Sequence, residues 1–340
     1  MNDRRTVWLP YRPERIAGLP DGLVHRYWDG SDALPGDPAD VGFLVGLPAP
    51  GAERPLARVL PLTRNLDVLQ LLSSGHEHIL PLVDRMPPGL RVSTGRGVHG
   101  GATAELAVTL LLALSRGIDG FVRRQPEGVW APAVRHTLLG KRVLVVGYGA
   151  VGTAVADRLR PFGCQLVPVA RTARSAAGRH VYSADDLPAL LPTADAVVLC
   201  APLTDRTHHM LGSAELALLP DGAILVNVGR GELVDTEALT REVRGGRLRA
   251  GLDVTDPEPL PAGHPLWRVP DALITPHVAA FTDAFAPMTE EFLVRQLHRY
   301  ARGEAVENVV LTVRGQQRGR GAGAGHTTDD KEHEGHDRAA

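Results

Sequence analysis

The chain of 340 residues contains very few cysteines and lysines. Its two cysteines, Cys164 and Cys200, are too few for a disulfide framework and lack the paired spacing of a zinc site, which favours a reducing compartment. Its two lysines, Lys141 and Lys331, do not form a phosphate-binding Walker loop, because Arg142 stands where that motif needs Ser or Thr. A Schiff-base lysine is not expected either, since one lysine precedes an apolar strand and the other lies in a polar tail.

Long apolar runs and an excess of one charge are also missing. Thirty-seven basic and 39 acidic side chains leave a net charge of -2, so no general electrostatic field draws nucleic acid or an anionic membrane. The longest apolar run, residues 107–115, is far too short for a membrane helix, and the charged N-terminus lacks the apolar stretch of a secretory signal. We therefore expect a cytoplasmic protein with no nucleic-acid or membrane partner.

The chain does contain enough apolar material, 44% of its residues, for one large or two medium domains. Short aliphatic runs alternate with helical patterns, which is typical of an α/β protein with parallel sheets and helical crossovers. The first series of predicted strands lies near residues 6–10, 23–27, 41–46, 68–73 and 90–94. The second series lies near residues 143–146, 166–170, 196–200, 223–228, 250–254 and 272–275.

Helices and connections complete this prediction. An apolar helix is expected over residues 104–115, followed by a polar stretch around Trp130 that suits a connection between domains. An amphipathic helix is expected from Met288 to Gly303. Residues 315–340 are glycine-rich and then charged, which predicts a disordered tail. We interpret the tail histidines as solvated side chains and expect no metal site: His326, His333 and His336.

A dinucleotide-binding motif, Gly-x-Gly-x-x-Gly, occurs twice, at residues 95–100 and at residues 147–152. Only the second copy has a buried strand before it, a helix starting at its end and a returning parallel strand, as the fingerprint requires. Gly147 allows the tight turn, Gly149 lets backbone N–H groups approach a pyrophosphate, and Gly152 lets helix and strand pack closely. Ala150 and Val151 complete this predicted cofactor loop.

The end of the returning strand bears on the choice of cofactor. An NAD-specific site normally has an acidic residue there for the ribose hydroxyls, but this chain has Ala170, followed by Arg171, Thr172 and Arg174. Guanidinium and hydroxyl groups bind a 2′-phosphate, which a carboxylate repels. NADP is therefore the preferred cofactor, with NAD as the alternative.

Chemically useful residues follow three strands of the second series. Arg230, Glu258 and His277 each lie at the carboxyl end of a predicted strand, where an open α/β sheet places its ligand crevice. Together they suit reduction of a 2-oxo acid. The arginine grips carboxylate and carbonyl oxygens, the histidine delivers a proton, and the glutamate supports the histidine while a nicotinamide supplies the hydride.

Five segments carry a resemblance to a known family: VLVVGYGAVG (143–152), CAPLTDRT (200–207), NVGRGELVD (227–235), GLDVTDPEPL (251–260) and TPHVAAFT (275–282). Over about residues 1–312 the chain resembles the D-isomer-specific 2-hydroxyacid dehydrogenases, most closely their NADPH-dependent glyoxylate/hydroxypyruvate reductases. The resemblance implies two Rossmann-like, doubly wound parallel-sheet domains. The dinucleotide-binding domain, residues 101–283, is inserted into a discontinuous substrate domain formed by residues 1–100 and 284–314.

Residue roles follow from the same resemblance. Arg230 matches the family's substrate-binding arginine, Glu258 its glutamate and His277 its catalytic acid/base. The loop of residues 71–76 matches the one that holds the substrate carboxylate, which implies substrate contacts for Ser74, Gly75 and His76. Further cofactor contacts are implied at the remaining strand ends: Ala201, Pro202, Thr207, Val228 and Asp253. The helix from Ala104 resembles the family's dimerisation helix, which implies a homodimer.

Two histidines depart from the family pattern and leave the substrate open. His99 replaces an asparagine near the substrate mouth, and His76 stands where a small apolar residue is usual. Relatives that act as NAD(H)-sensing corepressors provide an alternative reading of the fold. Formate oxidation is a further alternative, although formate-oxidising relatives have glutamine in the place of Glu258. Ser73 and Ser74 stand near the position of the lysine of phosphite-oxidising relatives.

Overall fold

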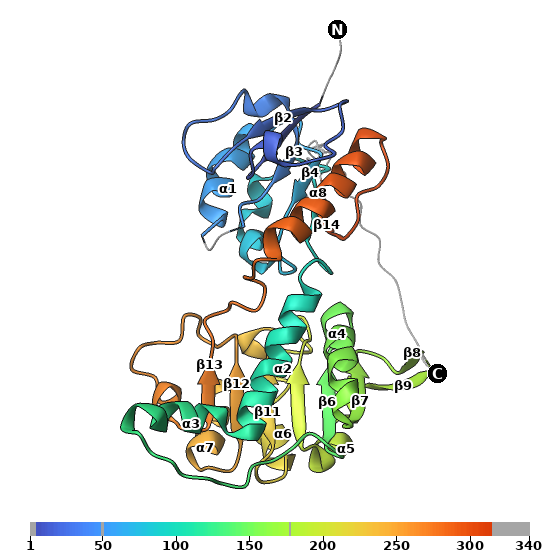
Figure 1. The fold of residues 1–340 in the computed structure, drawn as a ribbon. Helices are drawn as coiled ribbons and strands as arrows, with labels where there is room; N and C mark the ends of the chain where they lie inside the picture. The colour runs from blue at the N-terminus through green and yellow to red at the C-terminus, as the bar shows by residue number, and fades with distance from the viewer. Residues whose placement is uncertain (1–4, 49–50, 177, 315–340) are drawn as a thin grey trace, which may run out of the picture.

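The computed structural model describes residues 5–48, 51–176 and 178–314, which form two separate sheets (Figure 1). The first sheet has the order β14-β5-β4-β3-β1-β2, in which β1 to β5 are parallel and β14 is antiparallel to β5. Its strands are β1 (Thr6–Leu9), β2 (Val24–Tyr27), β3 (Val41–Val45), β4 (Val68–Gln70), β5 (Arg91–Ser93) and β14 (Val309–Thr312).

The second sheet has the order β13-β12-β11-β10-β6-β7-β9-β8, and all of its pairs are parallel except β8 with β9. Its central strands are buried along their whole length, which explains why their sequences are continuous aliphatic runs. Its strands are β6 (Arg142–Val146), β7 (Gln165–Ala170), β8 (Arg174–Ala176), β9 (Arg179–Ser183), β10 (Ala196–Leu199), β11 (Ile224–Asn227), β12 (Arg249–Leu252) and β13 (Ala272–Ile274).

Helices cover both sheets, and the two longest, α2 and α8, follow the two segments that pass between the sheets (Figure 1). The α2 side chains Ala107, Leu111 and Leu114 lie in the core of the second sheet, whereas Leu293 and Leu297 of α8 lie in the core of the first. The helices are α1 (Glu53–Val59), α2 (Gly100–Arg116), α3 (Ile118–Arg124), α4 (Ala150–Leu159), α5 (Leu187–Leu190), α6 (Ser213–Leu218), α7 (Thr236–Arg244) and α8 (Phe285–Ala301).

The chain therefore passes between the sheets just before α2 and again just before α8. We propose that these passages are the domain boundaries, with residues 101–283 inserted between residues 1–100 and 284–314. The polar stretch around Trp130 does not connect the domains as expected, because α2 already packs on the second sheet and this stretch runs from α2 to β6. The tail, residues 315–340, lies outside the described residues.

The α/β architecture is confirmed, with mixed rather than purely parallel sheets. The strands β8, β9 and β14 were not predicted. The edge strands β8 and β14 are short and largely exposed, so their sequences lack the apolar signal of a buried strand. The helices also begin earlier than expected, α2 at Gly100 and α8 at Phe285.

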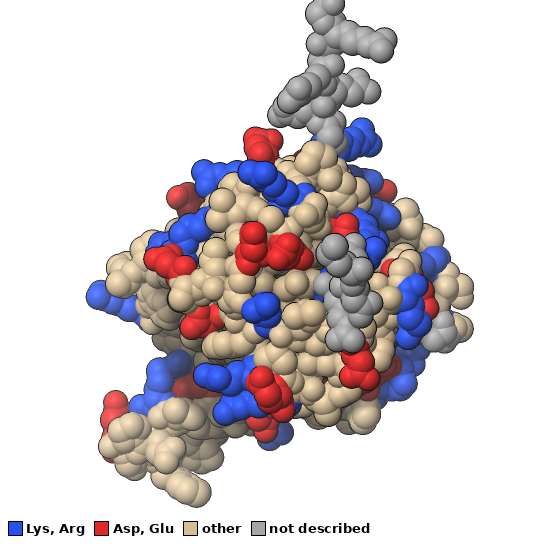
Figure 2. All heavy atoms as spheres, turned by 90° about the horizontal axis from the view of Figure 1, so that it is seen from above, with Lys and Arg blue, Asp and Glu red and all other residues tan. Residues whose placement is uncertain are grey.

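The surface carries both signs of charge. On the face shown in Figure 2, acidic and basic side chains are interspersed. Within residues 5–48, 51–176 and 178–314, no helix is long and apolar enough to cross a membrane.

Candidate active site

The glycine loop between β6 and α4 has the shape that a dinucleotide requires. Gly147 has a φ of 96°, and a side chain there would collide with the backbone of Cys200 and Ala201. Gly149 faces open space and directly precedes the first turn of α4, whose N–H groups have no side-chain cap. An uncapped helix N-terminus beside open space fits a pyrophosphate.

The other predicted cofactor residues also lie at the carboxyl ends of strands in this sheet. Ala201, Pro202 and Thr207 follow β10, and the Thr207 hydroxyl donates a hydrogen bond of 2.7 Å to the Pro202 carbonyl, which closes this turn. Val228 directly follows β11, and its backbone N–H donates to the Leu199 carbonyl at 3.1 Å. These turns therefore line the same edge of the sheet as the glycine loop.

The segment after β7 brings arginine to this edge. Arg171 and Thr172 are exposed immediately after the strand. The Arg174 guanidinium donates a hydrogen bond of 2.7 Å to the backbone carbonyl of Tyr148, inside the glycine loop. Arg174 thus lies against the predicted pyrophosphate-binding loop.

Arg230 is held by a tight turn after β11. The buried Asn227 side chain accepts a hydrogen bond of 3.0 Å from Gly229 N and donates one of 2.8 Å to the Arg230 carbonyl. The backbone of Gly231 lies so close to the Thr255 carbonyl that an added Cβ would collide with it. Glycine at this position therefore lets the Arg230 turn pack against the segment that leads to Glu258.

His277 and Glu258 form a direct pair across the ends of β12 and β13. The distance from His277 Nδ1 to Glu258 Oε1 is 2.6 Å, which leaves Nε2 as the free ring nitrogen. His277 has a φ of 54°, an uncommon conformation for a residue other than glycine. Its backbone N–H donates to the carbonyls of Asp253, at 2.8 Å, and Thr275, at 3.0 Å, which fixes this strained conformation.

The carboxylate of Asp253 organises the loop that carries His277. It is only 2% exposed and accepts hydrogen bonds from the Thr275 hydroxyl at 2.7 Å, from Val278 N at 3.0 Å and from Ala279 N at 3.1 Å. Both carboxylate oxygens therefore have partners within the protein. The sequence predicted a cofactor contact at Asp253. In the structure its carboxylate also holds the loop that carries His277.

Charge and hydrogen bonding set the protonation of the pair. The hydrogen bond from Glu258 raises the pKa of His277, against an opposing effect of burial and with support from the charges of Glu258 and Asp253. Burial acts to raise the pKa of Glu258, but its hydrogen bond to His277 and the charges of His277 and Arg230 lower it overall. The pair therefore favours a protonated imidazole beside an ionised carboxylate.

Arg230 also reaches the loop after β4 of the first sheet. Its Nη2 lies 3.5 Å from Glu77 Oε2, and an added Cβ on Gly75 would collide with the same guanidinium nitrogen. The Ser73 hydroxyl donates to the Gly75 carbonyl at 2.7 Å, which constrains the turn of the loop. Burial acts to raise the pKa of Glu77, but the charge of Arg230 lowers it overall, so Glu77 is anionic at neutral pH.

The predicted substrate residues are thus brought together in part. Gly75 lies beside Arg230, whereas Ser74 is exposed and His76 is partly exposed next to it in the same loop. Sequence reasoning missed Glu77, although it directly follows the predicted loop of residues 71–76. Within the described ranges, no group of three or more histidine, cysteine, aspartate or glutamate residues is placed to hold a metal ion.

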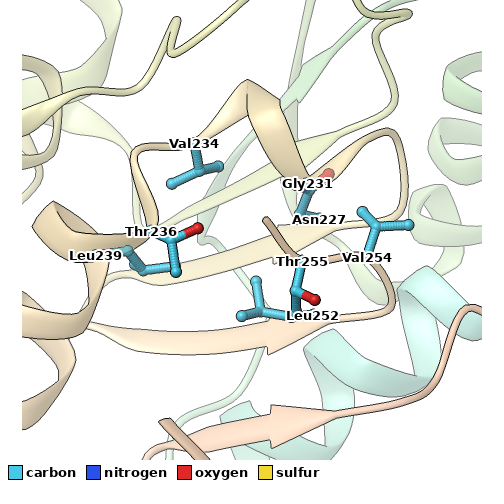
Figure 3. A pocket seen from close by; sticks show the side chains of 8 residues that line it. All are labelled: Asn227, Gly231, Val234, Thr236, Leu239, Leu252, Val254 and Thr255. Carbon is cyan, nitrogen blue, oxygen red and sulfur yellow. The ribbon is translucent and has the colours of Figure 1, made fainter. Parts of the chain in front are cut away.

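A small pocket lies behind the Arg230 turn (Figure 3). It has a volume of about 10 Å³, enough for one water molecule at most. A 2-oxo acid or a nicotinamide ring therefore does not fit there. Its lining comes from the ends of β11 and β12 and the start of α7: Asn227, Gly231, Val234, Thr236, Leu239, Leu252, Val254 and Thr255.

Comparison with known proteins shows similarity to one family. The family model described as "D-isomer specific 2-hydroxyacid dehydrogenase, NAD binding domain" matches residues 108–279. A glyoxylate reductase of Thermococcus litoralis is 32% identical over 282 residues, which cover 80% of this chain and 84% of the relative. A glyoxylate reductase of Thermococcus gammatolerans is 35% identical over 233 residues, covering 65% and 70% of the two chains.

Solved structures show the same architecture. A D-isomer specific 2-hydroxyacid dehydrogenase from Xanthobacter autotrophicus Py2, in complex with NADPH and MES, superposes with a TM-score of 0.74 at 30% identity over 91% of this chain and 98% of that one. A family protein from Aeromonas salmonicida subsp. salmonicida gives a TM-score of 0.80 at 28% identity over 91% and 99%.

The fold and the glycine loop define an NAD(P)-dependent oxidoreductase with two Rossmann-like domains. More narrowly, the chain belongs to the D-isomer specific 2-hydroxyacid dehydrogenase family. The resemblance to glyoxylate reductases that the sequence motifs indicate is confirmed at the level of similarity.

Proposed function

We propose that the protein interconverts a small 2-oxo acid, such as glyoxylate or hydroxypyruvate, and its D-2-hydroxy acid. The observation that carries the proposal is the 2.6 Å pair of His277 and Glu258, placed with Arg230 at the carboxyl ends of neighbouring strands. The relatives named glyoxylate reductase support this substrate class. A carboxylate paired with the histidine favours this chemistry over formate oxidation.

Substrate binding falls to Arg230 and the loop after β4. The guanidinium offers paired N–H donors that match a planar carboxylate, and it strengthens its hold as negative charge develops on the substrate oxygen. Ser74, Gly75 and His76 lie in the loop that faces this arginine, where backbone N–H groups hold the carboxylate. In the structure the carboxylate of Glu77 pairs with the Arg230 guanidinium. Binding of the substrate carboxylate would therefore replace Glu77 as the partner of Arg230.

Proton transfer falls to His277. Its Nδ1 is committed to Glu258, so Nε2 is the atom that gives a proton to the carbonyl oxygen in reduction and takes it back in oxidation. The loop of residues 147–152, together with Ala201, Pro202, Thr207 and Val228, would hold the dinucleotide, which would supply a hydride to the substrate C2 in reduction and accept one in oxidation. Asp253 keeps the His277 loop in place for this transfer.

NADP is the proposed cofactor. Arg171 and Thr172 are exposed at the end of β7, no carboxylate occupies that strand end, and Arg174 lies against the glycine loop. Arg171→Ala is expected to raise KM for NADPH about tenfold and to leave KM for NADH unchanged, because one charge-assisted phosphate contact is lost. Arg244→Ala, on α7, is the matched control. A wild-type protein with a higher kcat/KM for NADH than for NADPH contradicts this assignment.

A homodimer is proposed on a different surface from the one the sequence indicated. The apolar side of α2 is buried in its own domain, so the expected dimerisation helix has no large free face. The most exposed apolar side chains lie in the segment after α3, where Trp130 is 96% and Val134 99% exposed. Trp130→Glu is expected to convert a dimer into a monomer in light scattering, and a monomeric wild type at micromolar concentration contradicts the proposal.

The test of function is a spectrophotometric panel of glyoxylate, hydroxypyruvate, pyruvate and phenylpyruvate with each reduced nicotinamide. We expect wild type to reduce at least one of these acids. For His277→Gln we expect kcat to fall by about two decades or more. His208→Gln changes a second exposed histidine and serves as the control. Cofactor binding without turnover of any acid contradicts the proposal and matches the corepressor alternative.

A further inference from the structure

His99 is a nearly buried histidine, 6% exposed, at the start of α2 and outside the catalytic pair. Its Nε2 lies 2.9 Å from the backbone carbonyl of Leu72, so this nitrogen carries the hydrogen and donates. No other described residue donates to that carbonyl. Burial lowers the pKa of His99, although the hydrogen bond to the carbonyl opposes this, and the imidazole is therefore neutral.

Leu72 lies near the start of the substrate loop, residues 71–76, which follows β4. Ser73 follows Leu72, and the backbone carbonyl of Ser73 accepts a hydrogen bond of 2.8 Å from Gly95 N. An added Cβ on Gly95 would collide with the Leu72 carbonyl, which shows how closely the two segments pack. The residues before α2 thus pack directly against the substrate loop.

Phe285, the first residue of α8, is the second contact of His99. Its ring is stacked on the His99 imidazole with centroids 4.6 Å apart and planes 5° from parallel. Phe281 packs edge-on against Phe285 at 6.1 Å and lies four residues after His277. His99 therefore lies at the end of one segment that passes between the sheets, contacts Phe285 at the end of the other, and bonds to Leu72 of the substrate loop.

We propose that His99 is a positioning residue that fixes the substrate loop through the Leu72 carbonyl and joins it, through Phe285, to the segment that carries His277. The inference rests on the proposed function for its kinetic readout. His99 takes no part in proton transfer, because its donor nitrogen is committed to a backbone carbonyl. Its effect is on substrate binding and on the alignment of the two halves of the site.

The central test is His99→Phe, which keeps an aromatic ring for Phe285 but removes the hydrogen bond to Leu72. We expect KM for the 2-oxo acid to rise about tenfold, since a buried carbonyl loses its donor. We expect kcat to change by less than about threefold and KM for NADPH to remain unchanged, because the loop binds the acid and not the cofactor. A merely structural role would lower the melting temperature without raising KM for the acid relative to kcat and to KM for NADPH.

The chain offers a matched control in His298→Phe. His298 Nε2 lies 2.9 Å from the Gly18 carbonyl, so the same residue type makes the same kind of bond elsewhere in the first domain. We expect this variant to keep the wild-type KM. An equal rise of KM in both variants, or no rise in His99→Phe, overturns the proposal.

A second measurement does not need a known substrate. Hydrogen exchange of the amides of residues 71–76 is expected to accelerate about tenfold in His99→Phe and to stay unchanged in β6. Wild type that reduces no 2-oxo acid refutes the proposed function, while the exchange rates still decide the role of His99. Unchanged exchange in residues 71–76 refutes that role even if the enzyme is active.

Phe285→Leu provides the variant for the case in which His99→Phe does not fold. It keeps the imidazole and its hydrogen bond and removes the flat partner that orients the ring. We expect KM for the acid and the amide exchange rates of residues 71–76 to rise about threefold. This effect is smaller than in His99→Phe because the variant loses an aromatic contact and keeps the hydrogen bond. Wild-type values for both show that the stack positions nothing.

Discussion

Replacing Glu258 by glutamine tests the electrostatics of the proposed acid/base pair. The substitution removes the negative charge beside His277 and retains an oxygen that accepts the hydrogen bond from Nδ1. The pKa of His277, which Glu258 raises, is therefore expected to fall. Reduction needs the protonated imidazole, so the alkaline limb of its pH profile moves to lower pH, and the rise of the oxidation profile moves in the same direction.

The size of the effect follows from the exposure of the pair. Two unit charges about 4 Å apart attract each other by about 1 kcal/mol in water and by about 4 kcal/mol at an effective dielectric constant of 20. The side chains of His277 and Glu258 are 52% and 41% exposed, so solvent screening places the value near the lower limit. A free energy of about 1 kcal/mol corresponds to about a fivefold change in the acid dissociation constant of His277, and hence in its protonated fraction on the alkaline limb.

The assay is the rate of reduction at saturating cofactor and acid, measured across the pH range. On the alkaline limb, Glu258→Gln is expected to be about fivefold slower than wild type, and on the acid plateau the two are expected to agree. Glu291→Gln changes a carboxylate that is 82% exposed on α8 and is expected to match wild type throughout. A profile of Glu258→Gln that coincides with wild type at every pH refutes the role of the carboxylate charge.

Further predictions concern stability and binding. The contribution of His277 to stability is fully present below pH 6.5 and is lost as pH rises through its raised pKa. The contribution of Glu258 is present above pH 4.5 and is lost as pH falls through its lowered pKa. The melting temperatures of wild type and Glu258→Gln should therefore differ most between pH 4.5 and pH 6.5. Gly147→Ala should weaken NADPH binding in calorimetry roughly tenfold or more, because it strains a left-handed turn against neighbouring backbone. Asp253→Asn should lower the free energy of unfolding by about 1–3 kcal/mol in urea titrations, since one buried N–H loses its acceptor. Glu77→Gln should lower KM for the acid, as Arg230 loses a competing carboxylate, and a raised KM would show that Glu77 instead positions Arg230.

Much of the fold was predictable from local patterns. The buried parallel strands of the second sheet are continuous aliphatic runs, and the glycine loop has a strand and a helix in the required places. The antiparallel edge strands were not predictable in this way. Arg174–Ala176 is exposed and polar at its start, and it becomes a strand only because β9 offers free backbone groups beside it.

The site was predictable to the extent that its residues follow strands of one sheet. Arg230, Glu258 and His277 all lie at carboxyl ends of parallel strands, which topology alone brings to one edge. The contact of Arg230 with Glu77 joins residues 153 positions apart, which follow strands of two different sheets. No periodicity or motif records such a contact, because it depends on how the two domains pack.

The surroundings of His99 likewise depend on tertiary packing. In the sequence it is visible only as a departure from an asparagine near the substrate mouth. In the structure it is buried between Leu72, which belongs to the substrate loop, and Phe285, which follows the segment carrying His277. A two-domain enzyme must align groups that belong to different sheets, and a rigid contact at the two passages between them limits how far those groups separate. Because a donor ring that stacks on Phe285 and bonds to the Leu72 carbonyl does both tasks, histidine suits this position better than a side chain that does only one.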